Sequence, residues 1–166
     1  KILGLIINLL RSVPFIILLL LMLPVTRAIV GTLIGSKAVI PPLVVSATPY
    51  IARMVESSFR EVDAGVIEAA KSMGATTGQI VWKVLLPEAK PSLLVGAAIS
   101  ITTILGYTTM AGFVGGGGLG AIAINNGYYR YELGIMIVTV VLLIVIVQII
   151  QEIFMRISKA TDRRSR

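Results

Sequence analysis

Charged, polar and small side chains gather in one stretch of this 166-residue chain, EAAKSMGATTGQIVWKVLLPEAKP, which runs from Glu68 to Pro91. Catalysis in such a stretch would need a nucleophile, a general base or metal ligands. The sequence has no histidine and no cysteine, which excludes thiol chemistry, Cys/His metal sites and a Ser–His pair. A catalytic loop is therefore disfavoured, and the recognition of a surface or a partner remains.

The first part of this stretch is predicted to be a short amphipathic helix. Asp63 is a suitable residue for capping its start. Gly74 stands where a left-handed residue would end it. The apolar positions between these two recur at helical spacing: Val66, Ala70 and Met73.

A second short helix is predicted to follow at once. Thr76 and Gln79 have the spacing of a capping box. Pro87 is expected to end this helix, because proline cannot donate to the helical ladder. The apolar face between them consists of Ile80, Val81, Val84 and Leu85.

Three interpretations of the helix pair are open. It could lie against lipid headgroups, as many loops of membrane proteins do. It could dock its apolar face into a groove of a soluble partner. It could carry catalysis, which the missing histidine and cysteine disfavour.

The rest of the chain is predicted to supply the membrane-spanning helices that position this loop. Hydrophobic residues make up 56% of the sequence, charged residues 14%, and the mean hydropathy is +0.94. Such a composition is typical of membrane proteins, in which each span needs about 20 apolar residues. We expect one all-α domain of residues 1–166 with about four spans: Ile2 to Val25, Ala38 to Phe59, Ser92 to Val114 and Leu133 to Met155.

The basic residues indicate how the spans are oriented. Twelve of the 15 Lys and Arg residues fall on one predicted side, and only Arg27, Lys37 and Arg130 fall on the other. Short cytoplasmic loops carry the excess of basic residues. We therefore expect the loop of residues 60–90 and the C-terminus to be cytoplasmic, and the positive charge to reflect topology and anionic lipid, without nucleic acid.

The span from Ser92 to Val114 carries a second pattern. On a helical wheel, small and neutral polar residues form one stripe: Gly96, Ser100, Thr103, Tyr107, Met110 and Val114. Small residues commonly let neighbouring helices approach, so packing is one interpretation. The other is that the stripe lines a translocation route, with Met110 as a flexible apolar plug.

Two other membrane functions fit poorly. A proton-coupled transporter usually has ionisable groups at mid-membrane, and the last two spans have none at their centres. An intramembrane protease would need a His or paired Asp residues, but the only aspartates, Asp63 and Asp162, lie outside the spans.

The central loop resembles the EAA loop of ABC-importer permeases. That pattern reads EAA, three residues, G, nine residues, I, one residue, LP, and it is matched by Glu68, Ala69, Ala70, Gly74, Leu86 and Pro87, with Val84 in place of Ile. Further segments are similar to the methionine-import branch of type I permeases: RSVPFIILLL, PYIARMVESSF, GYTTMAGFVGGGGLG and NNGYYRY. Asp63 departs from the proline that often opens this loop, but both residues suit a helix start.

The resemblance implies a type I ABC-importer permease whose loop acts as a coupling helix. It implies that the six loop residues couple to ATPase subunits, which bind ATP and magnesium, while this chain holds no cofactor and hydrolyses nothing. It also implies a homodimer in a bacterial inner membrane, an external substrate-binding protein, and methionine or a close relative as cargo. Members of this branch usually have one more N-terminal span, so we expect a longer, five-span protein. Another small solute as cargo, or a pore that does not pump, remains the alternative.

Overall fold

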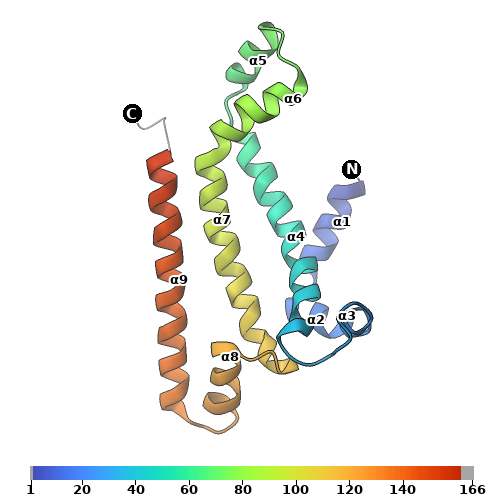
Figure 1. Ribbon diagram of the computed structural model, residues 1–166, viewed down its shortest axis with the longest axis vertical. Helices are drawn as coiled ribbons and strands as arrows, with labels where there is room; N and C mark the ends of the chain where they lie inside the picture. Colours follow the sequence, from blue (N-terminus) through green and yellow to red (C-terminus); the bar gives the residue numbers. More distant parts are fainter. Residues whose placement is uncertain (1, 162–166) are drawn as a thin grey trace.

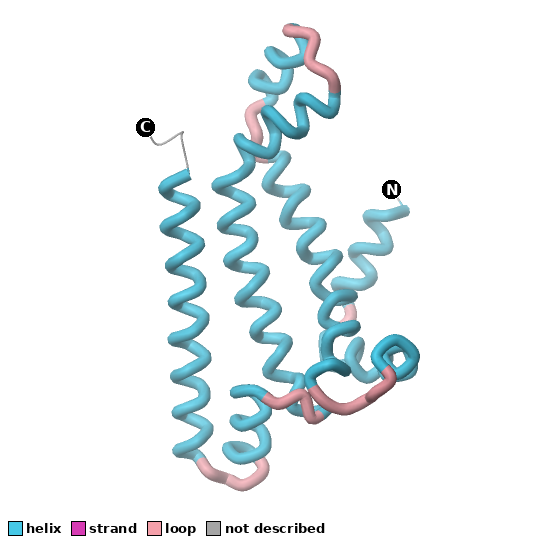
Figure 2. The backbone as a smooth tube through the Cα atoms, viewed as in Figure 1, coloured by secondary structure: helices cyan, strands magenta, loops and turns pink. Residues whose placement is uncertain are grey.

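The computed structural model describes residues 2–161, and within that range every regular element is a helix (Figure 1). Three helices are long and apolar enough to cross a membrane: Ser36–Arg60 (α4), the continuous stretch Thr77–Val114, and Leu133–Thr161 (α9). These three run side by side in Figures 1 and 2. The predicted all-α membrane fold is confirmed.

The predicted first span, Ile2 to Val25, is wrong as a single helix. The segment is broken into Ile2–Ser12 (α1), Phe15–Leu21 (α2) and Leu23–Val30 (α3). Pro14 has extended torsions, φ −56° and ψ 134°, and it has no N–H to continue α1. Three helices in the described residues are long and apolar enough to cross a membrane without a break.

The predicted end of the loop helix at Pro87 is also wrong. Thr77–Ile80 (α6) continues through a π-helical turn, Val81–Leu85 (η1), directly into Leu86–Thr109 (α7). The wider turn is closed by the Leu86 N–H, which donates to the carbonyl of Val81. Pro87 lies in the first turn of α7, where a missing N–H is tolerated because the π turn has already shifted the hydrogen-bond register. The second loop helix and the spanning helix are therefore continuous, with a change of direction between α6 and α7 (Figure 1).

The other three predicted spans are confirmed with longer bounds, and Ser92 to Val114 lies within the helical stretch Thr77–Val114. Ala38 to Phe59 lies inside α4, which includes Pro41, Pro42 and Pro49. Leu133 to Met155 is the greater part of α9.

The spanning helices pack with α7 in the middle, in contact with α4 on one side and α9 on the other. Gly96 of α7 lies so close to Met54 of α4 that a Cβ atom would collide with the Met54 thioether. At the far end of α7, Tyr107 stacks on Phe15 with ring centroids 4.8 Å apart. Phe15 belongs to a small core with Leu19, Val39 and Ala111. This core holds α2 against α4 and the end of α7.

The two ends of the bundle are built differently. Ala64–Ser72 (α5) and α6 project at the end where α9 finishes (Figure 1). The opposite end carries α3 and the short elements Met110–Val114 (η2), Gly118–Ile122 (α8) and Ala123–Tyr128 (η3). Of the 12 basic residues counted on one side, Lys1, Arg163, Arg164 and Arg166 lie outside the described residues.

Candidate functional site

The loop helix α5 is fixed at both ends by its own sequence. The Asp63 carboxylate accepts a 2.7 Å hydrogen bond from the Gly65 N–H at its start. At its end, the N–H groups of Gly74 and Ala75 donate to the carbonyls of Lys71 and Ala70, at 2.9 and 3.1 Å. This is a Schellman motif, and it requires the left-handed φ of +79° that Gly74 adopts. The predicted cap and the predicted glycine turn are both confirmed.

The start of α6 carries the predicted capping box. The Thr76 hydroxyl accepts from the Gln79 N–H at 3.4 Å, and the Gln79 side chain accepts from the Thr76 N–H at 2.9 Å. Only two residues, Ala75 and Thr76, separate the Gly74 turn from α6. The loop is thus a rigid helix–turn–helix unit that leads without interruption into α7.

The residues of the EAA pattern divide between the inside and the outside of this loop. Ala70 is buried where α5 contacts α6 and η1. Glu68, Ala69 and Gly74 are exposed. Leu86 is half-buried and Pro87 exposed at the start of α7. Ala70 therefore packs the loop together, while Glu68 and Ala69 lie on its outer surface.

Two large apolar side chains of the loop face outward, which the sequence reasoning did not predict. Met73 is 82% exposed and Trp82 is 74% exposed. Met73 was expected on the apolar face of α5, but only Ala70 of that face is buried. Each of these exposed apolar side chains is available for contact with another molecule.

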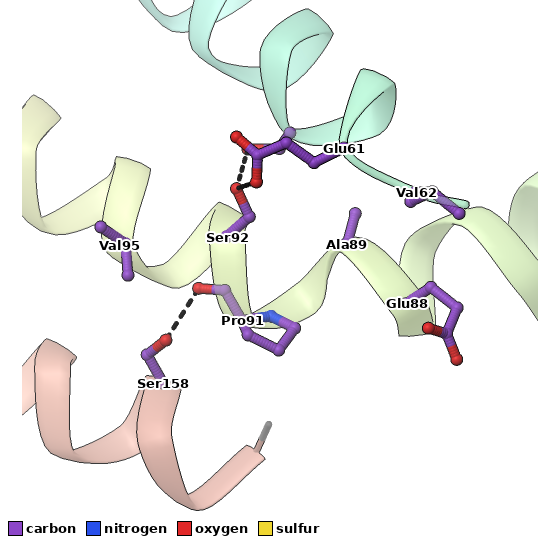
Figure 3. A pocket seen from close by; sticks show the side chains of 9 residues that line it. Glu61, Val62, Glu88, Ala89, Pro91, Ser92, Val95 and Ser158 are labelled. Atoms are coloured by element: carbon purple, nitrogen blue, oxygen red, sulfur yellow. Dashed lines mark hydrogen bonds between the residues drawn. The ribbon is translucent and has the colours of Figure 1, made fainter. Parts of the chain in front are cut away.

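Hydrogen bonds beneath the loop connect the spanning helices (Figure 3). The Ser92 hydroxyl lies 2.7 Å from the Glu61 carboxylate and 3.1 Å from the Ser58 hydroxyl, which joins α7 to the end of α4. Ser158 of α9 donates to the carbonyl of Pro91 at 2.8 Å. These residues line a cavity of about 380 Å³. Sequence reasoning missed this network, because single serines 31 and 67 residues from their partners form no local motif.

Part of the stripe on α7 contacts other helices of the same chain. Ser100 is buried and donates to the Gly96 carbonyl at 2.8 Å. Thr103 donates to the Ile99 carbonyl at 2.9 Å. Met110 and Tyr107 pack against the core around Phe15. The contacts of Tyr107 and Met110 are those that the packing interpretation expects, whereas the bonds of Ser100 and Thr103 stay within α7. The role of the stripe in translocation stays a prediction.

The family described as "Binding-protein-dependent transport system inner membrane component" matches residues 1–161. This chain belongs to that family. The assignment agrees with the EAA pattern and the three spanning helices, and it identifies the chain as an ABC-importer permease.

Individual relatives agree with the family assignment. A probable D-methionine transport system permease of Vibrio cholerae is 52% identical over 162 residues, covering 98% of this chain and 72% of the relative. A methionine import system permease of Bacillus subtilis is 44% identical over 164 residues, covering 99% and 74%. A solved structure of the MetNI methionine ABC transporter in an inward-facing conformation superposes with a TM-score of 0.92 at 52% identity, over 95% of this chain and 73% of that one. The predicted type I ABC-importer permease fold is confirmed.

Proposed function

We propose that this permease is the membrane subunit of an ATP-driven importer of methionine or a close relative. It works as a homodimer with separate ATPase subunits at the end that carries α5 and α6, and with a substrate-binding protein at the opposite end. ATP and magnesium bind to the ATPase subunits and not to this chain. The bundle lies in a bacterial inner membrane with the loop and the C-terminus in the cytoplasm.

The observation that carries the coupling role is the continuity of α6, η1 and α7. A partner that displaces the capped loop would move one helical stretch of 38 residues, Thr77–Val114, in which no loop residue separates α6 from α7. The hydrogen bonds from Ser92 to Glu61 and from Ser158 to Pro91 pass the same movement to α4 and α9. The exposed Met73 and Trp82 supply apolar contact area for the ATPase.

The proposed cargo, methionine, is inferred from the similar permeases. Both permeases compared above are named for methionine transport, and their identity to this chain extends over 98% and 99% of it. The neutral stripe of Ser100, Thr103 and Tyr107 has no charge that would hold an amino acid tightly during passage.

Reconstituted transport tests the proposal. The full-length permease, copurified with its ATPase and supplied with its binding protein, is placed in proteoliposomes, and the uptake of radiolabelled methionine and glutamine is followed with and without ATP. We expect ATP-dependent accumulation of methionine above the outside concentration. Equilibration without ATP would indicate a passive pore, and preferential uptake of glutamine would contradict the cargo.

A further inference from the structure

A second cavity, of about 330 Å³, lies deeper in the bundle between α1, α4 and α7. One part of its wall is polar, with Arg11, Tyr50 and Arg53. Another part is apolar, with Met54, Val95 and Ile99. An apolar cavity with a few converging polar groups is the usual form of a small-molecule site.

Arg53 is fixed in this cavity by bonds to two helices. Its Nη1 donates to the Glu56 carboxylate at 2.7 Å, and its Nη2 donates to the Asn8 amide oxygen at 3.2 Å. A Cβ atom on Gly4 would lie 3.6 Å from the same Nη2. Gly4 and Asn8 therefore mark the face of α1 that is turned toward α4. Arg11 follows Asn8 by three residues and so lies on this face as well, among the residues that line the cavity.

Arg11 differs from Arg53 in having no counter-charge. Within residues 2–161, Arg11 makes no hydrogen bond or ion pair, whereas the Glu56 carboxylate is shared between Arg53 and Arg60 at 2.7 Å each. Glu61, the acid among the described residues that line this cavity, lies eight residues beyond Arg53, about 12 Å along a helix axis, and accepts from Ser92. Arg11 is itself exposed in this chain, and the part of the cavity near it thus has an excess of positive charge.

We propose that this cavity receives the transported amino acid, with Arg11 pairing with the α-carboxylate. The apolar side chain of the cargo then lies against Met54, Val95 and Ile99. A guanidinium suits this role, because its planar N–H groups match the two oxygens of a carboxylate. The inference rests on the proposed import of methionine and extends it to a binding site within the membrane domain. A lipid headgroup phosphate is the other oxyanion that could neutralise Arg11, and the experiment separates the two.

Cysteine protection tests the site directly, since the chain contains no native cysteine. Ser57 lines the same cavity, so Ser57→Cys is made in the full-length permease, assembled with its ATPase in phosphatidylcholine proteoliposomes. The rate at which a small methanethiosulfonate reagent labels this cysteine is measured by mass spectrometry. We expect millimolar L-methionine to slow labelling about fivefold or more. Methioninol, which lacks the carboxylate, should leave the rate unchanged.

Substitutions of Arg11 test its role in binding the cargo. Arg11→Gln should abolish protection by methionine, and Arg11→Lys should keep part of it. In vesicles supplied with binding protein, Arg11→Gln should lower maximal uptake about tenfold, while the apparent KM, set by the binding protein, stays unchanged. Arg27→Gln is the matched control, because Arg27 is an exposed arginine on α3 at the other end of the bundle, and it should retain full protection and uptake.

Each result decides the matter. Protection that persists in Arg11→Gln would overturn the proposal, as would equal protection by methioninol. Slower labelling on addition of anionic lipid alone would assign Arg11 to a headgroup phosphate. A wild-type transporter that imports methionine yet shows no protection refutes this site and leaves the proposed function standing, whereas one that does not import methionine refutes the function itself. If Arg11→Gln does not assemble, the Arg11→Lys variant is used in its place. Protection by methionine as strong as in the wild type would then also overturn the proposal.

Discussion

The Ser92 hydroxyl of α7 donates a 2.7 Å hydrogen bond to the carboxylate of Glu61, the residue that caps the end of α4. The capped loop begins two residues later, at Asp63. The bond therefore ties the helix before the loop to the helix after it, 31 residues further along the chain. We expect this connection to help a movement of the loop reach both spanning helices together.

Ser92→Ala should therefore uncouple the permease more than it destabilises it. The Ser92–Glu61 bond is exposed, so its loss should reduce the free energy of unfolding by only about 1 kcal/mol. The ratio of methionine molecules imported to ATP hydrolysed should fall severalfold in proteoliposomes. Thr161→Ala is the matched control, because the Thr161 hydroxyl bonds only within α9; an equal loss of coupling in both variants would count against a specific role for Ser92.

Gly74→Val should weaken the association with the ATPase by distorting the loop. No atom lies within 4 Å of a Cβ built on Gly74, so the cost comes from the left-handed backbone, about 1–2 kcal/mol. A β-branched residue at positive φ would instead release the Schellman turn and redirect α5. ATPase copurification and cargo-stimulated hydrolysis should both fall.

Two matched variants show whether the backbone is the cause. Gly74→Asn should retain most of the association, because asparagine tolerates the left-handed region. Gly78→Ala should be harmless, since Gly78 is helical with open space around it. Full association in Gly74→Val would show that the turn is not needed for coupling.

The orientation of the bundle in the membrane can be tested with single introduced cysteines, because the chain has no native cysteine. The basic residues predict that the segment Arg60 to Lys90 is cytoplasmic and that Gly115 to Arg130 is external. In intact cells, a membrane-impermeant maleimide should label Tyr129→Cys, whose native side chain is 58% exposed, and should label Thr77→Cys only after lysis. Labelling of Thr77→Cys from outside would reverse the topology.

Local signals explain which parts of the loop could be predicted from sequence. The Asp63 cap, the Thr76–Gln79 capping box and the Gly74 turn depend on residues two to five positions apart, so their spacing alone determines them. The prediction that the helix ends at Pro87 was wrong, because it did not take into account the π turn before this proline. That turn shifts the register over Val81–Leu85.

Features set by tertiary packing could not be predicted in the same way. The break at Pro14 lies in a sequence as apolar as a true span, and α2 owes its position to the contact of Phe15 with Tyr107, 92 residues away in the chain. The Ser92–Glu61 and Asn8–Arg53 contacts likewise join distant segments. The stripe on α7 was visible in the sequence, but only the fold shows which helices it contacts.

For Met110, the two interpretations of the stripe on α7, helix packing and closure of the translocation pathway, predict different results. Its half-buried side chain packs on the core around Phe15 at the far end of α7. If this packing is its main role, Met110→Ala should lower the free energy of unfolding by about 2 kcal/mol, at the low end for truncating a core methionine, and the vesicles should stay tight. If Met110 also closes the pathway against its symmetry mate, the flexible thioether acts as a plug that yields when the helices part. Met110→Ala should then leak small solutes or hydrolyse ATP without uptake, while the complex still assembles.

We predict the second result, and thermal unfolding together with solute leak in proteoliposomes measures both. Met110→Leu is the control, because it keeps the volume and apolar character of the side chain and should restore a tight seal. Leu43→Ala, at another half-buried residue packed on the same core, separates the two effects, since it should destabilise the protein without opening a leak. A Met110→Ala permease that is destabilised but as tight as Leu43→Ala would leave the stripe with a packing role only.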